Sequence, residues 1–442
     1  LKNGLSVYIW EDESKSDVFG LVGVRAGSIN DPEEYTGLAH YLEHVMFKGT
    51  DKIGALNWTE EEPIYKEIIA KYDQMAEEAD PAIKEAISKE INELTVKAGK
   101  LGLPNEYSNL MESMGAKGVN AGTYYDWTFY HSSFPAYQIN KWLEISSQRF
   151  LHPVFRSFQS ELENVYEEYN RSQDDQGRAQ NQFVMEKAFE GHPYSRSIIG
   201  LPEHLKNPRL SKLIEFYEQW YVPENMVLVL VGRINAAFGR LAAKPSPERK
   251  VYQNLEIKGR KQYSAKVGFY PQVAMVFNGV PAGHPDEDAL DIALALLNNN
   301  SQTGTMDKLV LDGELTSAGA YTRTFREQGR AIVAAIPLYD ENQRRFESTK
   351  SAEKKALKAI QQIANGEFED WKIDAIKAEK CRQFDLEMES NEDKAMILMN
   401  AFYNEQDLGD ILNYKDKIMA ITTDDIKRVA KKYLSDNYLA LY

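Results

Sequence analysis

The sequence predicts an α+β protein made of two homologous domains, each a mixed or antiparallel sheet covered by helices. Apolar runs of strand length alternate with stretches of helical periodicity along the chain. The chain also repeats itself, because the segment ending in the apolar run 226–232 resembles the C-terminal segment 429–442. We therefore expect a first domain at 1–233, a linker at 234–264 and a homologous second domain at 265–442.

Composition narrows the possible functions. The 442 residues are 43% hydrophobic and 27% charged, as in a globular protein with sizeable cores, and the net charge of −15 argues against nucleic acid as a partner. No apolar run reaches the roughly 18 residues that span a bilayer. Cys381 is the only cysteine, so any zinc requires histidine and carboxylate ligands. The chain begins at Leu1 without a signal peptide, so we expect it to be a processed or trimmed piece. As a separate expectation, a periplasmic or secreted location is favoured over a cytoplasmic one.

The first domain is expected to contain four strand segments and several helices. The second strand segment has little polar content, which indicates burial on both faces, and the third is rich in aromatic and β-branched residues. The strand segments are 5–10, 18–24, 118–130 and 226–232. Helices are expected around 135–150 and 159–172.

Residues 58–104 are expected to form a helical hairpin inserted into the first domain. Apolar residues keep helical spacing in both halves of this segment, and Asp80-Pro81 is typical of the start of a second helix. The many charges between the apolar positions indicate a solvated face. We interpret the segment as an arm that takes no part in chemistry.

Residues 37–49 contain the strongest functional signal in the chain. A helix here would place five apolar side chains on one stripe, namely Leu38, Tyr41, Leu42, Val45 and Met46. His40 and His44 lie one turn apart on the opposite side, so both imidazoles can reach one ion, with Glu43 beside them. This H-x-x-E-H pattern is the inverse of the H-E-x-x-H zinc helix. Chance placement among seven histidines has a probability of about one in a hundred.

A catalytic zinc site requires a third protein ligand. The candidates are glutamates in the segment 160–169 of the helix expected around 159–172, where Glu161 and Glu168 share one stripe about 10 Å apart. Zinc–carboxylate distances are about 2.0–2.2 Å, so these two cannot both bind one ion. Glu163 and Glu167 point away and are expected to be solvated. The residues alone leave Glu161 and Glu168 as alternatives.

Together these motifs resemble the pitrilysin/insulinase family of inverzincin zinc metallopeptidases. The pattern His40-x-x-Glu43-His44 followed by Glu161-x6-Glu168 carries the resemblance, which extends over essentially the whole chain. It implies one Zn²⁺ per chain, bound by the two histidines and Glu168. It also implies that Glu43 is the general base, and that Glu161 contacts the metal ligands without binding the metal itself. The fold of two homologous halves agrees with this family.

The resemblance further implies a zinc-dependent endopeptidase that hydrolyses unfolded peptides or oligopeptides. The substrate would pair as a strand with an exposed sheet edge at Asn120, Ala121 and Thr123. The family completes its active site with an Arg and a Tyr from a second homologous half, whereas this chain has Tyr321 but Val310 at the expected Arg position. We therefore expect a homologous metal-free half, either a C-terminal segment or a separate subunit, to close a chamber around the peptide substrate.

Two other functions are compatible with parts of the sequence. One is a catalytically silent structural or partner subunit of a peptidase complex, although such members usually lose motif residues that this chain retains. The other is a metal carrier, which explains the two histidines but gives Glu43 no role. Metal-dependent peptide cleavage separates all three functions.

Overall fold

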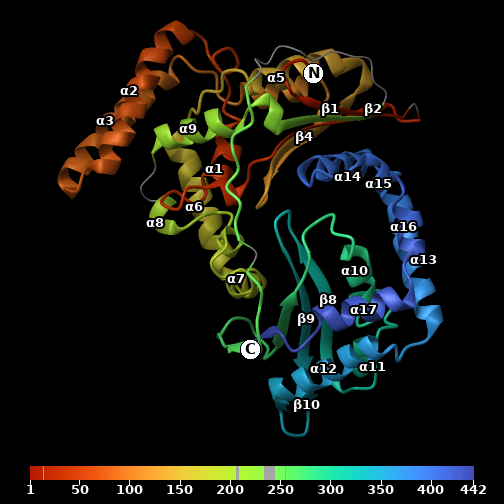
Figure 1. The fold of residues 1–442 in the computed structure, drawn as a ribbon. Helices are drawn as coiled ribbons and strands as arrows, with labels where there is room; N and C mark the ends of the chain where they lie inside the picture. Colours follow the sequence, from red (N-terminus) through yellow and green to blue (C-terminus); the bar gives the residue numbers. More distant parts are fainter. Residues whose placement is uncertain (13, 206–208, 233–243, 254) are drawn as a thin grey trace. The chain divides into compact units, whose positions relative to one another are not determined.

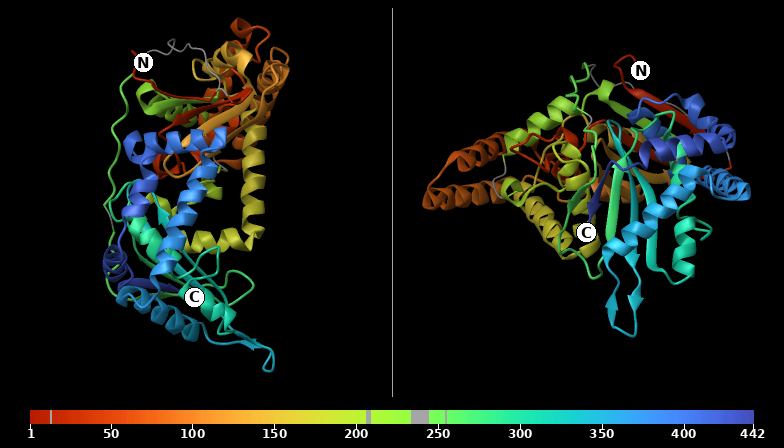
Figure 2. Two further views of the ribbon diagram at one scale, coloured as in Figure 1. Left: turned by 90° about the vertical axis from the view of Figure 1, so that its right-hand side faces the viewer. Right: turned by 60° about the horizontal axis from the view of Figure 1, so that its bottom comes forward.

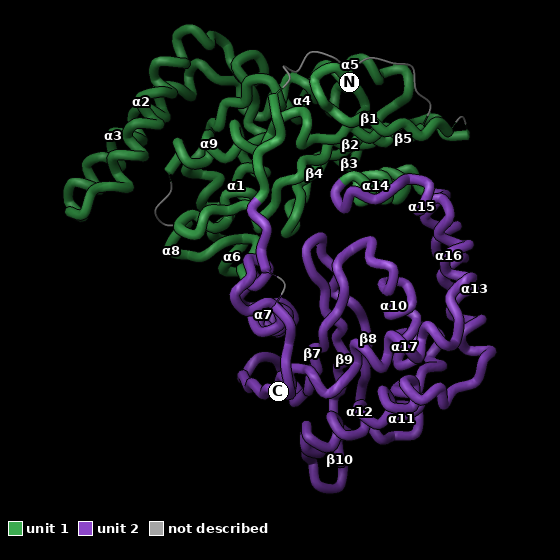
Figure 3. The backbone as a smooth tube through the Cα atoms, viewed as in Figure 1, with its two compact units in different colours: residues 1–171, 196–249, 390–402 green, residues 172–195, 250–389, 403–442 purple. Residues whose placement is uncertain are grey.

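The computed structural model describes residues 1–442 except 13, 206–208, 233–243 and 254. Part of the predicted linker 234–264 therefore lies outside the described residues. The backbone forms two compact units (Figures 1 and 3). Unit 1 comprises 1–171, 196–249 and 390–402, and unit 2 comprises 172–195, 250–389 and 403–442. Each unit thus includes a short segment from the other half of the sequence.

Unit 1 is built on a five-stranded mixed sheet. Its strand order is β1 (Ser6–Glu11), β5 (Met226–Gly232), β2 (Asp17–Val24), β4 (Thr128–Pro135), β3 (Lys117–Thr123). The pair β1–β5 is parallel and the other pairs are antiparallel. The predicted strand at 118–130 is in fact two strands joined by a turn at 124–127. Because β3 is the last strand, its outer backbone edge has no neighbouring strand among the described residues.

Helices bury the apolar surface of this sheet. The five residues of the predicted apolar stripe on 37–49 are each at most 9% exposed, which confirms the helical phase of this segment. The helices of unit 1 outside the insertion are α1 (Leu38–Val45), α4 (Glu106–Ser113), α5 (Ile139–Arg149), α8 (Pro202–Leu205), α9 (Leu210–Trp220) and most of α6 (Phe158–Asp174) and α14 (Asn391–Tyr403).

The insertion forms two helices, α2 (Trp58–Glu77) and α3 (Pro81–Gly99), as predicted. They lie side by side in Figure 1 and in the right-hand view of Figure 2, and together they are called the arm below. Asp80 caps α3 by accepting a hydrogen bond from the backbone of Ala82 at 2.8 Å. The chain enters and leaves the arm side by side, because Ala55 and Gly102 form an antiparallel bridge.

Unit 2 repeats the topology of unit 1. Its strand order is β6 (Lys261–Tyr263), β12 (Tyr438–Leu441), β7 (Val273–Asn278), β9 (Gly329–Pro337), β8 (Leu315–Thr324), again with one parallel pair at the first edge. In both sheets the last strand of the repeat lies between the first and the second. This shared order confirms the predicted fold class of two homologous sheet domains.

The helices of unit 2 cover its sheet, and α10 follows the strand β7 as α1 follows β2. A short hairpin, β10 (Tyr339–Asp340) and β11 (Arg345–Phe346), extends from the sheet. The helices are α7 (Gln176–Ala188), α10 (Glu287–Ala295), α11 (Thr305–Leu311), α12 (Thr349–Asn365), α13 (Asp370–Glu387), α15 (Leu408–Leu412), α16 (Tyr414–Ala420) and α17 (Thr423–Tyr433). None of the helices in the described ranges is long and apolar enough to cross a membrane.

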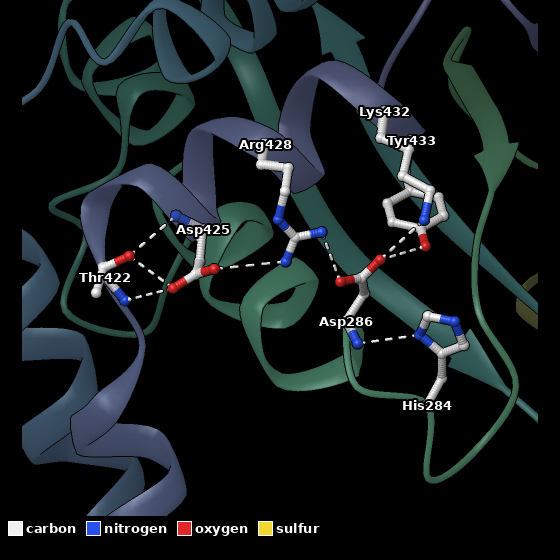
Figure 4. Close-up of polar contacts among 7 residues, drawn as sticks. All are labelled: His284, Asp286, Thr422, Asp425, Arg428, Lys432 and Tyr433. Carbon is white, nitrogen blue, oxygen red and sulfur yellow. Dashed lines mark hydrogen bonds and ion pairs between the residues drawn. The ribbon is translucent and has the colours of Figure 1, made fainter.

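A buried carboxylate fastens α17 to the start of α10 (Figure 4). Asp286 accepts hydrogen bonds from Arg428 at 2.7 Å, Lys432 at 3.0 Å and the Tyr433 hydroxyl at 2.6 Å. Its backbone N–H donates to His284 Nδ1 at 3.0 Å. Burial alone would raise the pKa of the Asp286 carboxyl group. The hydrogen bonds from Tyr433, Arg428 and Lys432 have the larger effect, so the pKa lies below its usual value. These contacts are structural, so His284 needs no other role.

Candidate active site

The site is organised by α1, whose start is capped by a buried side chain. Asp31 accepts hydrogen bonds from the backbone N–H groups of Gly37 at 2.7 Å and Ala39 at 2.9 Å. These N–H groups belong to the beginning of the helix, where no carbonyl of the helix can reach them. Gly37 has φ of 90°, a conformation that favours glycine. Burial raises the pKa of Asp31 to about 7.

Two helices bring three candidate metal ligands together. His40 and His44 of α1 and Glu168 of α6 each offer one donor atom, and these atoms lie within 4.8 Å of one another. Glu168 Oε2 is 3.7 Å from both His40 Nε2 and His44 Nε2. Donors around a tetrahedral zinc ion lie about 3.4 Å apart. Among the residues that the structure describes, this is the group of His, Cys, Asp and Glu with metal-binding geometry.

The chemistry of the donors also fits zinc. Burial lowers the pKa of His40 to about 3, so this imidazole is neutral and has a lone pair for a metal. Two imidazole nitrogens with one carboxylate oxygen are a ligand set that zinc takes in catalytic sites. The ring centroids of His40 and His44 are 4.9 Å apart with the planes at 75°, so the rings do not stack on each other. The residues present therefore fit a zinc ion.

The structure separates the two candidate glutamates of α6. Glu161 lies outside the donor group, with Oε2 3.7 Å from His44 Nδ1 and Oε1 2.7 Å from Lys48 Nζ. Glu161 therefore contacts the Nδ1 atom of His44, whereas Glu168 faces the Nε2 atoms of both histidines. The hydroxyl of Tyr41 donates to the carbonyl of Phe158 and so joins α1 to the first turn of α6.

Glu43 lies beside the donor group and is held by the edge strand. Thr123 Oγ1 donates a hydrogen bond to Glu43 Oε2 at 2.9 Å. Burial raises the pKa of Glu43, and the hydrogen bond from Thr123 opposes this shift. Asn120 and Ala121 pair with His131 and Tyr130 of β4 on the inner side of β3, which leaves the outer side for another strand.

Sequence reasoning missed three features of this site. It did not identify Asp31 as the cap of α1, although Asp31 lies only 6 and 8 positions before the N–H groups that it binds. It placed Thr123 at the substrate edge but did not predict its hydrogen bond to Glu43, which lies 80 positions away. The third is Arg149, which is 3% exposed. Its guanidinium carbon lies 4.0 Å from the ring centroid of Tyr107 and 4.5 Å from that of Phe47. Burial raises the pKa of Glu43, and the charge of Arg149 is one of the effects that oppose this shift. No local sequence pattern identifies Arg149, although a buried Arg among aromatic residues is a recognised signal once burial is known.

The second copy of the fold carries no comparable site. The α10 helix contains acidic residues but no histidine. Tyr321 lies on β8 and is 40% exposed, and Val310, at the expected position of the family's Arg, lies on α11. Within the described residues, the candidate metal-ligand group thus lies in unit 1.

Comparison with protein-family models identifies the family. The model described as "Insulinase (Peptidase family M16)" matches residues 7–62 and 93–201, and the model described as "Peptidase M16 inactive domain" matches residues 209–380. The chain therefore belongs to peptidase family M16, the pitrilysin/insulinase family, which confirms the resemblance inferred from the motifs. The first model skips residues 63–92, which lie within the arm.

Several known proteins are similar to this chain. "Zinc protease PqqE" of Helicobacter pylori is 21% identical over 450 residues, covering 99% of this chain and 89% of the relative. The "Insulin-degrading enzyme homolog" of Dictyostelium discoideum is 26% identical over 236 residues, covering 53% of this chain and 19% of that protein. The first of these relatives is named a zinc protease, which agrees with a family of zinc-dependent peptidases.

Solved structures share the fold. A protease from Helicobacter pylori superimposes with a TM-score of 0.79 at 20% identity, covering 100% of this chain and 97% of that chain. The periplasmic protease PqqL from Escherichia coli superimposes with a TM-score of 0.73 at 17% identity, covering 100% of this chain but 46% of that chain. This chain thus covers nearly all of the Helicobacter pylori protease and less than half of the Escherichia coli protease.

Proposed function

We propose that this chain is a zinc-dependent endopeptidase that hydrolyses unfolded peptides. The observation that carries the proposal is the convergence of donor atoms of His40, His44 and Glu168 within 4.8 Å. Glu43 lies close enough to interact electrostatically with His44 and Glu168. A zinc ion held by His40, His44 and Glu168 supplies Lewis acidity, which polarises the scissile carbonyl and lowers the pKa of a water molecule.

Side chains of the protein carry out the proton transfers. Glu43 accepts a proton from the attacking water and later donates it to the leaving amine, which requires a carboxylate held within hydrogen-bonding reach. Thr123 fixes one oxygen of that carboxylate. Glu161 contacts the Nδ1 atom of His44, and Glu161 in turn forms an ion pair with Lys48. Such partners orient a metal-binding histidine.

The open edge of β3 is the proposed substrate site. An extended peptide adds to this edge as a further strand, with backbone hydrogen bonds to the segment that contains Asn120, Ala121 and Thr123. Backbone pairing depends little on the substrate's sequence but requires an unfolded segment. Thr123 connects the two parts of the site, because its backbone belongs to the strand and its hydroxyl binds Glu43.

A homologous metal-free half is the proposed partner. It would be a C-terminal segment of a longer polypeptide or a separate subunit, and it would close a chamber around the peptide. The coverage of 46% of the Escherichia coli protein supports this, since that chain is long enough for two such halves. We also propose a periplasmic or secreted location, in line with the periplasmic description of that relative.

The test is cleavage of a fluorescence-quenched, unfolded peptide by the 442-residue chain, with its mass in solution measured in parallel. We expect slow cleavage that a chelator abolishes and added zinc restores. A catalytically silent subunit or a metal carrier would bind zinc without cleaving the peptide, which would contradict the proposal. Full activity as a monomer would refute the part of the proposal that requires a second half.

A further inference from the structure

We propose that a cavity at the base of the arm binds a small aromatic carboxylate. The cavity lies within unit 1 and has a volume of about 200 Å³. Its walls come from α2, α3, the segment 102–105 and the first turn of α6. The family model skips residues 63–92, so the wall residues Tyr65, Ile68 and Tyr72 lie outside the part of this chain that it matches. The proposal does not depend on peptidase activity.

The walls are suited to an aromatic ring. Tyr65, Ile68, Tyr72 and Phe158 line the cavity, and the last three are at most 8% exposed. The rings of Tyr72 and Phe158 meet edge to face, with centroids 4.7 Å apart. A cavity of about 150 Å³ with apolar walls holds one benzene molecule. The present cavity therefore has room for one ring and a short polar group, and its aromatic walls offer favourable contacts to that ring.

One side of the cavity is suited to an anion. Lys48 lines it, and only one of the three donors of an ammonium group is needed for the contact with Glu161 at 2.7 Å. The first turn of α6 also lines it, and the first N–H groups of a 17-residue helix favour a negative charge. Arg156 is nearby, but Glu61 pairs with it through two hydrogen bonds of 2.6 and 2.9 Å. Lys48 is likewise paired with Glu161, so the cavity offers an anion the remaining N–H donors of Lys48 and the first N–H groups of α6. A carboxylate supplies two oxygen acceptors for these donors.

The test is ¹⁹F NMR titration of the 442-residue chain with 4-fluorophenylacetate. The neutral analogue 4-fluorophenylacetamide, which has nearly the same shape, is the matched ligand control. We expect a dissociation constant in the millimolar range or below for the acid, and binding of the amide at least about tenfold weaker. Absence of binding by the acid at millimolar concentrations, or equal binding of acid and amide, would overturn the proposal.

Variants locate the binding to this cavity. Ala98 is a half-buried wall residue of α3, so Ala98→Leu adds a larger side chain to the cavity wall and should abolish binding. Ile68→Phe, at a buried wall position of α2, gives the same test if the first variant does not fold. Lys48→Met should weaken binding at least about tenfold, whereas Lys52→Met, at an exposed position, should not. Wild-type affinity in a folded cavity-filling variant, or equal effects of the two lysine variants, would refute the proposed site.

Discussion

Removal of the Asp31 carboxyl group should destabilise unit 1 and disturb the metal-binding helix. Asp31→Ala leaves the buried N–H groups of Gly37 and Ala39 without their acceptor. Each unsatisfied buried group costs about 1–3 kcal/mol, so the total is about 2–6 kcal/mol. The middle of this range lowers the melting temperature by about 8–16 °C in a unit of roughly 150–250 residues. Zinc content should also fall, because Ala39 directly precedes His40.

The effect of pH distinguishes this carboxyl group from a simple packing residue. Burial raises the pKa of Asp31 from 3.8 to about 7 in the folded protein. The folded state therefore binds a proton more tightly than the unfolded state. The resulting stability is fully present below about pH 4 and is lost as the pH rises through 7, by up to about 1.4 kcal/mol per pH unit. Asp31→Asn, which cannot ionise, should lack this part of the pH dependence.

Thermal unfolding at pH 6, followed by circular dichroism, measures the effect together with zinc content. Glu34→Ala is the matched control, because Glu34 is an exposed acid on the same loop. We expect no more than a small shift for the control. Equal melting temperatures for the Asp31→Ala and Glu34→Ala variants would refute the capping argument.

Three further predictions concern the site and the arm. Glu43→Gln should retain zinc but lower the cleavage rate by about 10²–10⁴-fold, and near wild-type cleavage would exclude Glu43 as the base. Glu168→Gln should strongly lower the zinc occupancy, and Glu161→Gln should lower the zinc affinity by about 10–100-fold. Glu167→Gln should leave zinc binding unchanged, and equal zinc losses in the Glu167 and Glu168 variants would contradict the ligand assignment. Deletion of 57–100, with a short linker across the bridge, should preserve zinc binding while lowering the melting temperature, and loss of zinc from a folded deletion variant would place the arm in the site.

Local patterns predicted most of the fold. Helical spacing identified the arm, and apolar runs identified the buried strands, since these signals arise within one element. The turn at 124–127 was missed because its sequence, Tyr-Tyr-Asp-Trp, contains no Gly or Pro and continues the aromatic strand pattern. The exchange of 172–195 and 390–402 between the two units has no local signature, because it depends on tertiary packing.

The site was predictable to the extent that it is local. His40, Glu43 and His44 share one helix face because of their spacing, which helix geometry determines. The choice between Glu161 and Glu168 required either the family resemblance or the structure, because spacing places both on one stripe. Contacts such as Thr123 with Glu43 join residues 80 positions apart, so no sequence period predicts them.

The most direct test of the central claim is a zinc titration of the metal-free chain with peptide cleavage as the readout. We expect the cleavage rate to rise in proportion to added zinc and to level off at one zinc per chain. The Glu43→Gln variant should bind the same single zinc without comparable cleavage. Cleavage that does not depend on zinc, or one bound zinc that produces no cleavage in the unmodified chain, would contradict the assignment of a zinc peptidase site to His40, His44 and Glu168.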